Sequence, residues 1–222
     1  MFDNYLRGIK DRLAEPIARR LSKVNPNSMT LLGLFIGIGS AVFAFFGIYF
    51  WAFAFWLINR SLDGLDGVIA RMYHKQDDFG GYLDTMSDFV VYAALPISIV
   101  LGAPSPTRYV TLIVMLGIFY INTASWMYLA AILEKQMSRE PETKTTIIMP
   151  TGLVGGFETI VFFSLFILFP DYVTVFFLVY IFFVIFSIFQ RLIWAKRQFR
   201  LITLKGNQHE NQYISTRIYH EK

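Results

Sequence analysis

The sequence is organised around residues 63–71, Asp-Gly-Leu-Asp-Gly-Val-Ile-Ala-Arg, and around three residues that follow them, Gly80, Asp84 and Asp88. At 3.6 residues per turn, Asp63, Asp66 and Gly67 lie on one face of a helix. The spacing of four between the three later residues places them on one face of a second helix. The pattern therefore predicts two neighbouring helices that each present two aspartates to the other.

The residues on either side of this stretch, 51–59 and 89–101, are apolar enough to lie in a membrane. An isolated carboxylate inside a bilayer costs about 3 kcal/mol or more, so four facing carboxylates require cations between them. Carboxylate oxygens are the ligands that Mg²⁺ and Mn²⁺ prefer. We therefore predict two such ions, held by Asp63, Asp66, Asp84 and Asp88.

The composition is that of a membrane protein. Of the 222 residues, 55% are hydrophobic and only 16% are charged, which is too apolar for an ordinary soluble domain. Helices satisfy their own backbone polar groups in lipid, so we expect an all-α, polytopic membrane domain in contact with membrane lipids. The absence of cysteine excludes disulfides, thiolate metal sites and cysteine nucleophiles.

Residues 1–24 form the first predicted segment. Apolar residues recur there at helical spacing among six lysines and arginines, at Leu6, Ile9, Leu13, Ile17 and Leu21. This pattern is typical of an amphipathic helix that lies on an anionic membrane surface. The alternative is a solvated helical leader without a role at the lipid surface.

Six membrane-spanning helices are predicted within residues 25–194. The 30 residues from 29 to 58 carry no charge and are too long for one span of about 20 residues, so we expect a turn near residues 47–51. Residues 195–222 are expected to form a polar tail that is mobile from about residue 203. After the first helix, the remaining five are predicted at about 51–70, 80–101, 109–133, 151–169 and 172–190.

The basic residues set the predicted orientation. With six spans both termini lie on one side, and 19 of the 20 lysines and arginines fall there, including Arg60, Arg71 and Lys75 around the loop assigned after the second helix. Only Arg108 falls opposite. This asymmetry predicts a cytoplasmic active site and cytoplasmic termini, as in a bacterial inner membrane. It also explains the net charge of +4 without a nucleic-acid partner.

The eight positions also resemble the complete signature of the class I CDP-alcohol phosphotransferases, or CDP-alcohol phosphatidyltransferases: Asp63-x2-Asp66-Gly67-x2-Ala70-Arg71-x8-Gly80-x3-Asp84-x3-Asp88. The resemblance implies a homodimeric membrane enzyme of phospholipid biosynthesis. It implies a metal-dependent transfer of the phosphatidyl group from CDP-diacylglycerol to a small, water-soluble, hydroxylated acceptor, with release of CMP. The resemblance also assigns Asp88 the role of the base that takes the acceptor's proton. The residues themselves leave open whether Asp88 is base, metal ligand or both.

The donor site is predicted at the end of the second helix and the start of the third. The Arg71 guanidinium suits the donor phosphates. Gly67 and Gly80 lack side chains and would let the nucleotide approach the backbone closely. By resemblance, three more residues belong to this site: Ala70, Thr30 and Asn27.

Residues 84–89, Asp-Thr-Met-Ser-Asp-Phe, indicate which class of acceptor to expect. Enzymes that make phosphatidylglycerol phosphate or cardiolipin tend to carry Asp-Pro-x-Ala-Asp-Lys there, and this chain has neither the proline nor the lysine. It is more similar to the serine-type and uncharacterised bacterial branches. For Glu158, a structural ion pair with Arg191 is an open alternative to function, and Asn122 is assigned to a hydrogen bond between helices. The candidate acceptor-site residues are Glu158, Lys144 and Arg191.

Two other functions fit parts of the pattern. A hydrolase would use water in place of the alcohol acceptor. A divalent-cation transporter would also place acids in membrane helices. Transport requires acids distributed along a path, whereas these four cluster at one depth beside an arginine suited to phosphate, so the transferase is the favoured interpretation.

Overall fold

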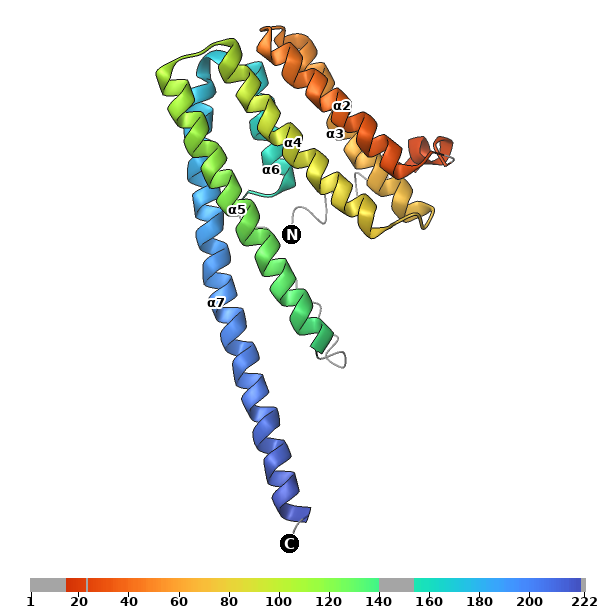
Figure 1. Ribbon diagram of the computed structural model, residues 1–222, viewed down its shortest axis with the longest axis vertical. Helices are drawn as coiled ribbons and strands as arrows, with labels where there is room; N and C mark the ends of the chain where they lie inside the picture. The colour runs from red at the N-terminus through yellow and green to blue at the C-terminus, as the bar shows by residue number, and fades with distance from the viewer. Residues whose placement is uncertain (1–14, 23, 140–153, 221–222) are drawn as a thin grey trace. The chain divides into compact units, whose positions relative to one another are not determined.

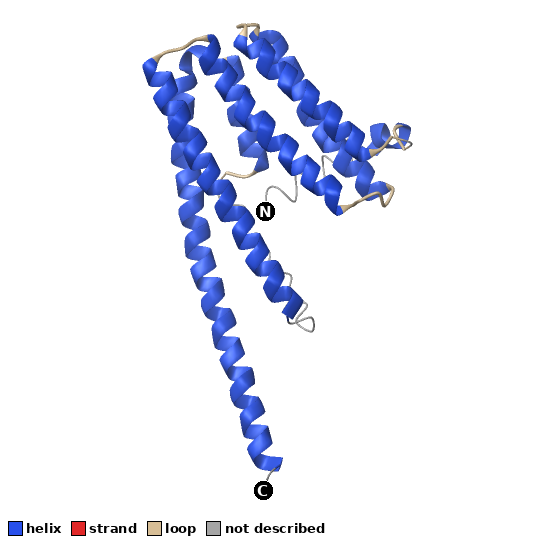
Figure 2. Cartoon of the chain, viewed as in Figure 1, coloured by secondary structure: helices blue, strands red, loops and turns tan. Residues whose placement is uncertain are grey.

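The computed structural model describes residues 15–22, 24–139 and 154–220, and all regular structure in them is helical. Figure 1 shows the helices in chain order and Figure 2 their connecting loops. The elements are α2 (Pro26–Phe45), α3 (Tyr49–Met72), α4 (Asp78–Gly102), α5 (Pro106–Arg139), α6 (Gly156–Leu168), the single 3₁₀ turn η1 (Pro170–Tyr172) and α7 (Val173–His220). The all-α expectation is thereby confirmed for the described residues.

The chain forms two compact units. The first comprises residues 1–117 and 155–181, and the second comprises residues 118–154 and 182–222. The first unit contains α2, α3, α4 and α6, and therefore both halves of the aspartate pattern.

The predicted turn after the first apolar segment is confirmed. α2 ends at Phe45 and α3 begins at Tyr49, and Gly47 between them has φ +73°. A positive φ costs glycine little because it has no Cβ. At its start α2 is capped by Asn25, whose side chain accepts a hydrogen bond from the Asn27 backbone nitrogen at 3.0 Å.

Small and polar residues bring α2 close to its neighbours in the first unit. A Cβ at Gly37 would lie within 2.5 Å of the Val91 side chain on α4, so only glycine permits this approach. The Ser40 hydroxyl donates to the Ala52 carbonyl of α3 at 2.7 Å. These contacts are the type that joins helices in lipid, where apolar burial alone favours no particular neighbour.

Aromatic side chains pack α6 against α3 and α4. The rings of Trp56 and Phe163 stack with centroids 5.6 Å apart, and Tyr92 meets Phe163 edge-on at 5.1 Å. The Trp56 indole also donates to the Ser164 hydroxyl at 3.0 Å. This apolar wall lies directly beside the polar half of α3.

Four stretches of helix are long and apolar enough to cross a membrane: Pro26–Phe45, Asp78–Gly102, Pro106–Lys135 and Pro170–Arg200. They support an integral membrane protein. The other two predicted spans correspond to α3, which carries several charges, and to α6, which is only 13 residues long. The expected start of the fifth span, residues 151–153, lies outside the described residues.

The two ends of the membrane domain differ from expectation in different ways. Residues 15–20 are helical, and Ala18 is fully buried in a cluster with Met29, Val68 and Ile69, so this segment packs on α2 and α3. Its first 14 residues lie outside the described part. Residues 203–220 of the expected mobile tail continue α7 as one helix to His220, and their mobility stays a prediction. Extending an existing helix needs no new nucleus, which explains why a polar sequence can follow the apolar one in the same conformation.

Candidate functional site

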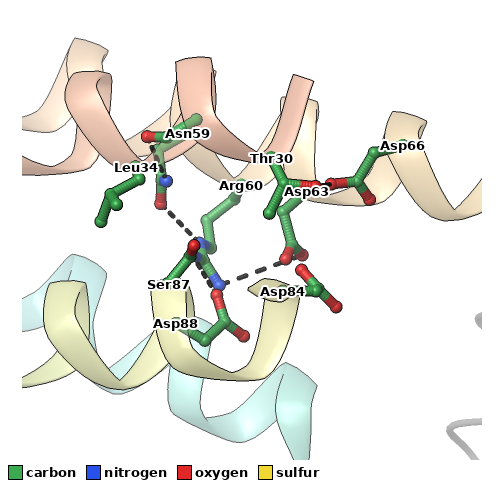
Figure 3. Close-up of a pocket in the computed structure, with 10 residues that line it drawn as sticks. Thr30, Leu34, Asn59, Arg60, Asp63, Asp66, Asp84, Ser87 and Asp88 are labelled. Atoms are coloured by element: carbon green, nitrogen blue, oxygen red, sulfur yellow. Dashed lines mark hydrogen bonds and ion pairs between the residues drawn. The ribbon is translucent and has the colours of Figure 1, made fainter. Parts of the chain in front are cut away.

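The four aspartates of the pattern meet at one small cavity, as the helical spacing predicts. Asp63 and Asp66 come from α3, and Asp84 and Asp88 come from α4. Figure 3 shows these side chains directed toward the space between the two helices. The cavity holds about 10 Å³ and is lined by Thr30, Gly33, Leu34, Asn59, Arg60, Asp63, Asp66, Asp84, Ser87 and Asp88.

Thr30 connects α2 to this acidic cluster. Its hydroxyl donates a hydrogen bond to Asp66 Oδ2 at 2.7 Å, and both side chains are buried. The structure therefore places Thr30, predicted as a nucleotide contact, against one of the predicted metal ligands. A hydrogen bond of this kind fixes which oxygen of a carboxylate points into the cavity.

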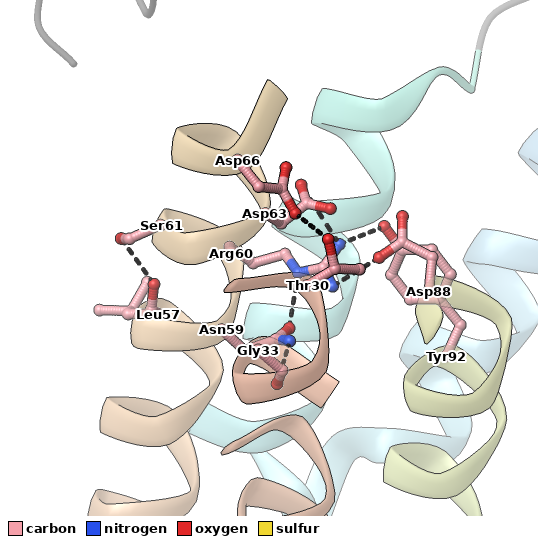
Figure 4. Close-up of polar contacts among 10 residues, drawn as sticks. All are labelled: Thr30, Gly33, Leu57, Asn59, Arg60, Ser61, Asp63, Asp66, Asp88 and Tyr92. Atoms are coloured by element: carbon pink, nitrogen blue, oxygen red, sulfur yellow. Dashed lines mark hydrogen bonds and ion pairs between the residues drawn. The ribbon is translucent and has the colours of Figure 1, made fainter. Parts of the chain in front are cut away.

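Arg60 is the residue of the cavity that the sequence analysis missed. It was counted only among the basic residues around the motif loop, but it lies inside α3, and its side chain is only 7% exposed. Its Nη2 donates to Asp88 Oδ1 at 2.7 Å and its Nη1 to the Tyr92 hydroxyl at 2.8 Å. Its Nη1 also lies 4.0 Å from Asp63 Oδ2. Figure 4 shows the guanidinium extending from α3 toward Asp88 and Tyr92 on α4.

The surroundings of Arg60 hold its guanidinium in place. The Nε donates to Asn59 Oδ1 at 2.8 Å, and Asn59 itself donates to the Gly33 carbonyl of α2 at 2.8 Å. The guanidinium also lies over the rings of Trp56 and Tyr92, 4.9 and 5.0 Å from their centroids. A signal was present in the sequence: a basic residue in an apolar run, three positions before an acid, lies on the same helix face as that acid.

A larger pocket of about 170 Å³ adjoins the acidic cavity, and Thr30, Asp66 and Asp84 line both. All six residues predicted to bind the donor line this pocket, so the structure brings that predicted set together. The lining also includes Lys75, whose Nζ donates to the carbonyls of Ser22 at 2.8 Å and Val24 at 3.2 Å. The full lining is Pro26, Asn27, Thr30, Asp66, Gly67, Ala70, Arg71, Lys75, Gln76, Asp77, Gly80, Gly81 and Asp84.

The two glycines of this pocket make room for neighbouring side chains. A Cβ at Gly80 would lie 2.7 Å from Asn27 Oδ1 and 3.0 Å from Asp77 Oδ1. Asp77 is the N-cap of α4 and accepts a hydrogen bond from the Gly80 backbone nitrogen. A Cβ at Gly67 would lie 3.2 Å from Arg71 Nη1. The close approach expected for a nucleotide is made here by Asn27 and Arg71.

The candidate acceptor residues are found in different places. Glu158 accepts a hydrogen bond from the Gly155 backbone nitrogen at 2.9 Å and caps its own helix, α6. Arg191 lies in the second unit, where its Nη1 is 3.1 Å from both the carbonyl and the side-chain oxygen of Asn122. The predicted interhelical bond of Asn122 is thereby confirmed, and its partner is the arginine once considered for Glu158. Lys144 lies outside the described residues.

The donor set of the acidic cavity fits hard divalent cations in chemical type. Four carboxylates and a hydroxyl supply only oxygen ligands, as Mg²⁺ and Mn²⁺ require. As the side chains stand, however, the described residues contain no group of three or more acids or histidines arranged to hold an ion. Arg60 accounts for part of this, because its guanidinium occupies Asp88 Oδ1.

Comparisons with known proteins agree with the signature. The chain is 31% identical to the inner membrane protein YnjF of Escherichia coli (strain K12) over 172 residues, which are 77% of this chain and 83% of that protein. It is 36% identical to the CDP-diacylglycerol–serine O-phosphatidyltransferase of Helicobacter pylori (strain J99), but only over 73 residues, 32% of this chain and 30% of that protein.

A solved structure shares the fold. The crystal structure of Mycobacterium tuberculosis phosphatidylinositol phosphate synthase (PgsA1) with CDP-DAG bound matches with a TM-score of 0.64 and 20% identity, over 83% of this chain and 94% of that chain. At this identity the likeness concerns the fold alone. The sequence model of one family, CDP-alcohol phosphatidyltransferase, matches residues 23–186, which include both pockets. This chain therefore belongs to the CDP-alcohol phosphatidyltransferase family, a family of membrane enzymes that transfer phosphatidyl groups.

Proposed function

We propose that this protein transfers the phosphatidyl group of CDP-diacylglycerol to a small, hydroxylated, water-soluble acceptor and releases CMP in phospholipid biosynthesis. The observation that carries the proposal is the pair of adjoining pockets. One is lined by the four signature aspartates and the other by the signature glycines and Arg71, and they share Asp66 and Asp84. A phosphate bound beside Arg71 would thus lie next to the acids that serve the reaction.

The reaction assigns a task to each pocket. In the larger pocket, Arg71 binds the donor phosphates and Asn27 contacts the nucleotide. In the smaller one, Asp88 accepts the proton of the acceptor hydroxyl. The hydroxyl oxygen then forms a bond to the phosphatidyl phosphorus, the bond from that phosphorus to the CMP oxygen breaks, and CMP leaves.

Proteins of this family use divalent metal ions. We propose that Asp63, Asp66 and Asp84 hold them here, with Asp88 as a further ligand of a second ion. When bound, two Mg²⁺ or Mn²⁺ ions neutralise charge on the phosphate oxygens. The chain's own contribution is to fix these carboxylates, as Thr30 does for Asp66.

The membrane arrangement is part of the proposal. α3 has 24 residues and reaches about 36 Å, enough to cross a core of about 30 Å, whereas α6 alone reaches about 20 Å. We infer that both cross with their flanking residues, giving six spans, with the site and both termini cytoplasmic, in a homodimer of a bacterial inner membrane. The distribution of the basic residues supports this orientation.

The acceptor is proposed to be a small alcohol of the serine type. Residues 84–89 support it, and so does the local similarity to a CDP-diacylglycerol–serine O-phosphatidyltransferase. Arg191 and Lys144 are proposed to attract an anionic group of the acceptor. Glu158 is the weakest of the three acceptor candidates, because its carboxylate already caps α6.

The test is CMP release from CDP-diacylglycerol by purified protein in lipid nanodiscs. We expect release only with Mg²⁺ or Mn²⁺ and an alcohol acceptor, and we expect Asp84→Asn to abolish it. Asp78→Asn is the matched control, because Asp78 is an exposed acid of the same helix that lines neither pocket. CMP release that persists in EDTA would contradict the proposal. CMP release with phosphatidic acid as the only lipid product, whichever alcohol of a panel is supplied, would identify a hydrolase.

A further inference from the structure

Arg60 is the only basic residue among those that line the acidic cavity. The sequence signature does not include it, and the proposed reaction gives it no task. A positive charge at this place is notable because the cavity is otherwise suited to cations. The question is therefore how a resident guanidinium affects the four carboxylates around it.

The bonds of Arg60 and Tyr92 converge on Asp88. Arg60 Nη2 donates to Asp88 Oδ1, while Nη1 donates to the Tyr92 hydroxyl oxygen. Because that oxygen accepts from Arg60, the hydroxyl hydrogen is directed elsewhere, and Tyr92 hydrogen-bonds the Asp88 carboxylate. Figure 4 shows the two bonds of the guanidinium, one to Asp88 and one to the Tyr92 hydroxyl.

Arg60 is itself fixed by groups outside the acidic cluster. Asn59 accepts from its Nε, and the Asn59 amide is anchored to the Gly33 carbonyl of α2. Trp56, which the guanidinium covers, is fully buried and bonded to Ser164 of α6. The position of the charge is therefore set by α2, α3 and α6, and does not depend on a bound ion.

The charges of the cavity lining sum to three negative when all four aspartates are ionised, because Arg60 offsets one of them. The guanidinium is bonded to Asp88 and lies 4.0 Å from Asp63 Oδ2, so its charge repels any other cation that approaches either carboxylate. In water-like surroundings, one unit charge about 6 Å from a divalent ion changes its affinity by roughly tenfold, and by more in a less polar medium.

We propose that Arg60 is a built-in counter-cation of the site and the positioning residue of Asp88. It holds Asp88 by one carboxylate oxygen, so that the second oxygen serves the reaction, and it weakens divalent-cation binding at the Asp88 end of the cavity. This inference rests on the proposed function for the role of Asp88 but not for the effect on cation binding.

The test measures Mn²⁺ binding directly, by electron paramagnetic resonance of the full chain in nanodiscs without nucleotide. Arg60→Met should bind Mn²⁺ roughly tenfold more tightly than the wild type, because the competing charge is gone. At saturating Mn²⁺ the same variant should release CMP more slowly, because Asp88 has lost its anchor. A residue that acted only in packing would lower activity without tightening Mn²⁺ binding.

Three variants separate charge from geometry. Arg60→Lys keeps the charge but lacks the planar fork, so its Mn²⁺ affinity should stay within about twofold of the wild type while kcat falls. Tyr92→Phe keeps the ring and should lower kcat without changing Mn²⁺ affinity. Arg19→Met removes an exposed arginine paired with Glu15 and should change neither quantity.

The outcomes are decisive in both directions. Unchanged or weaker Mn²⁺ binding by Arg60→Met overturns the counter-cation role. If that variant does not fold, wild-type kcat in both Arg60→Lys and Tyr92→Phe overturns the positioning role. A wild-type protein that releases no CMP, while Arg60→Met still binds Mn²⁺ more tightly, would refute the proposed function and leave the counter-cation role supported.

Discussion

Arg60 in the first unit and Arg191 in the second are both buried arginines of long helices, yet their guanidinium groups meet different partners. Arg60 bonds the Asp88 carboxylate and lies 4.0 Å from Asp63, so its charge is offset. Arg191, only 2% exposed, bonds the backbone and amide oxygens of Asn122, and no ion pair to it occurs among the described residues.

The difference shows two ways in which a fold can accommodate a buried arginine: beside carboxylates, or beside neutral oxygens. Arg60 has a hydrogen-bond partner for each of its three nitrogens, which is typical of a charge that organises a site. Arg191 has a buried Nε without a hydrogen-bond partner in the described structure. Burying a charge is costly unless it is paired, so Arg60 and Arg191 differ in how far that cost is offset.

The largest effect is expected when the carboxylate partner of Arg60 is replaced by an amide, the kind of side chain that Arg191 contacts. Asp88→Asn replaces its carboxylate by an amide and removes the proposed base. We expect the rate of CMP release to fall by roughly 10² to 10⁴, the usual contribution of a general base. The rate is measured at saturating donor and acceptor beside Asp78→Asn. A near-wild-type rate would mean that another group accepts the proton.

Removing each guanidinium in turn should affect stability in opposite ways. Arg60→Met leaves Asp88 without its cation and should lower the free energy of unfolding by about 3 kcal/mol, the low end for a broken buried pair because the Asp88 side chain is 27% exposed. Arg191→Met replaces an unneutralised charge by an apolar chain of similar length and should be neutral or stabilising. Thermal unfolding in one detergent compares the two, and equal losses would contradict the distinction.

A smaller effect is expected when Arg191 is given a carboxylate. Asn122→Asp keeps the shape of the side chain and replaces the neutral amide oxygen that accepts from the Arg191 cation by a carboxylate oxygen, which we expect to add about 1 kcal/mol to the free energy of unfolding. Asn122→Ala serves as the opposite control and should destabilise. If the aspartate variant is as unstable as the alanine variant, then burying a second charge outweighs the new ion pair.

The aspartate pattern could be predicted from the sequence because it depends on local geometry. Asp63 and Asp66 share a face by helical spacing alone, and the same holds for Asp84 and Asp88. Their meeting required only that α3 and α4 be neighbours facing one another. The α3 side of the larger pocket followed for the same reason, since Gly67 and Arg71 are one turn apart.

The role of Arg60 could not be predicted in this way. Its main partner, Asp88, is 28 residues away on another helix, so the bond depends on how far α3 and α4 slide along one another. In the sequence, basic residues were used only as indicators of membrane orientation. Arg60 was therefore counted with the residues around the loop, although its side chain lines the acidic cavity. The cap made by Glu158 was missed because the predicted helix begins at about residue 151, whereas α6 begins at Gly156.

One consequence follows from the lining of the larger pocket. It carries three acids, Asp66, Asp77 and Asp84, against two cations, Arg71 and Lys75, and the lysine amine is already bonded to two backbone carbonyls. When all of these groups are ionised, the lining carries one net negative charge, which opposes the negative pyrophosphate of the proposed donor. We therefore expect ordered binding, in which a cation binds first and the proposed CDP-linked donor binds second. The donor should bind weakly to the protein that holds no cation.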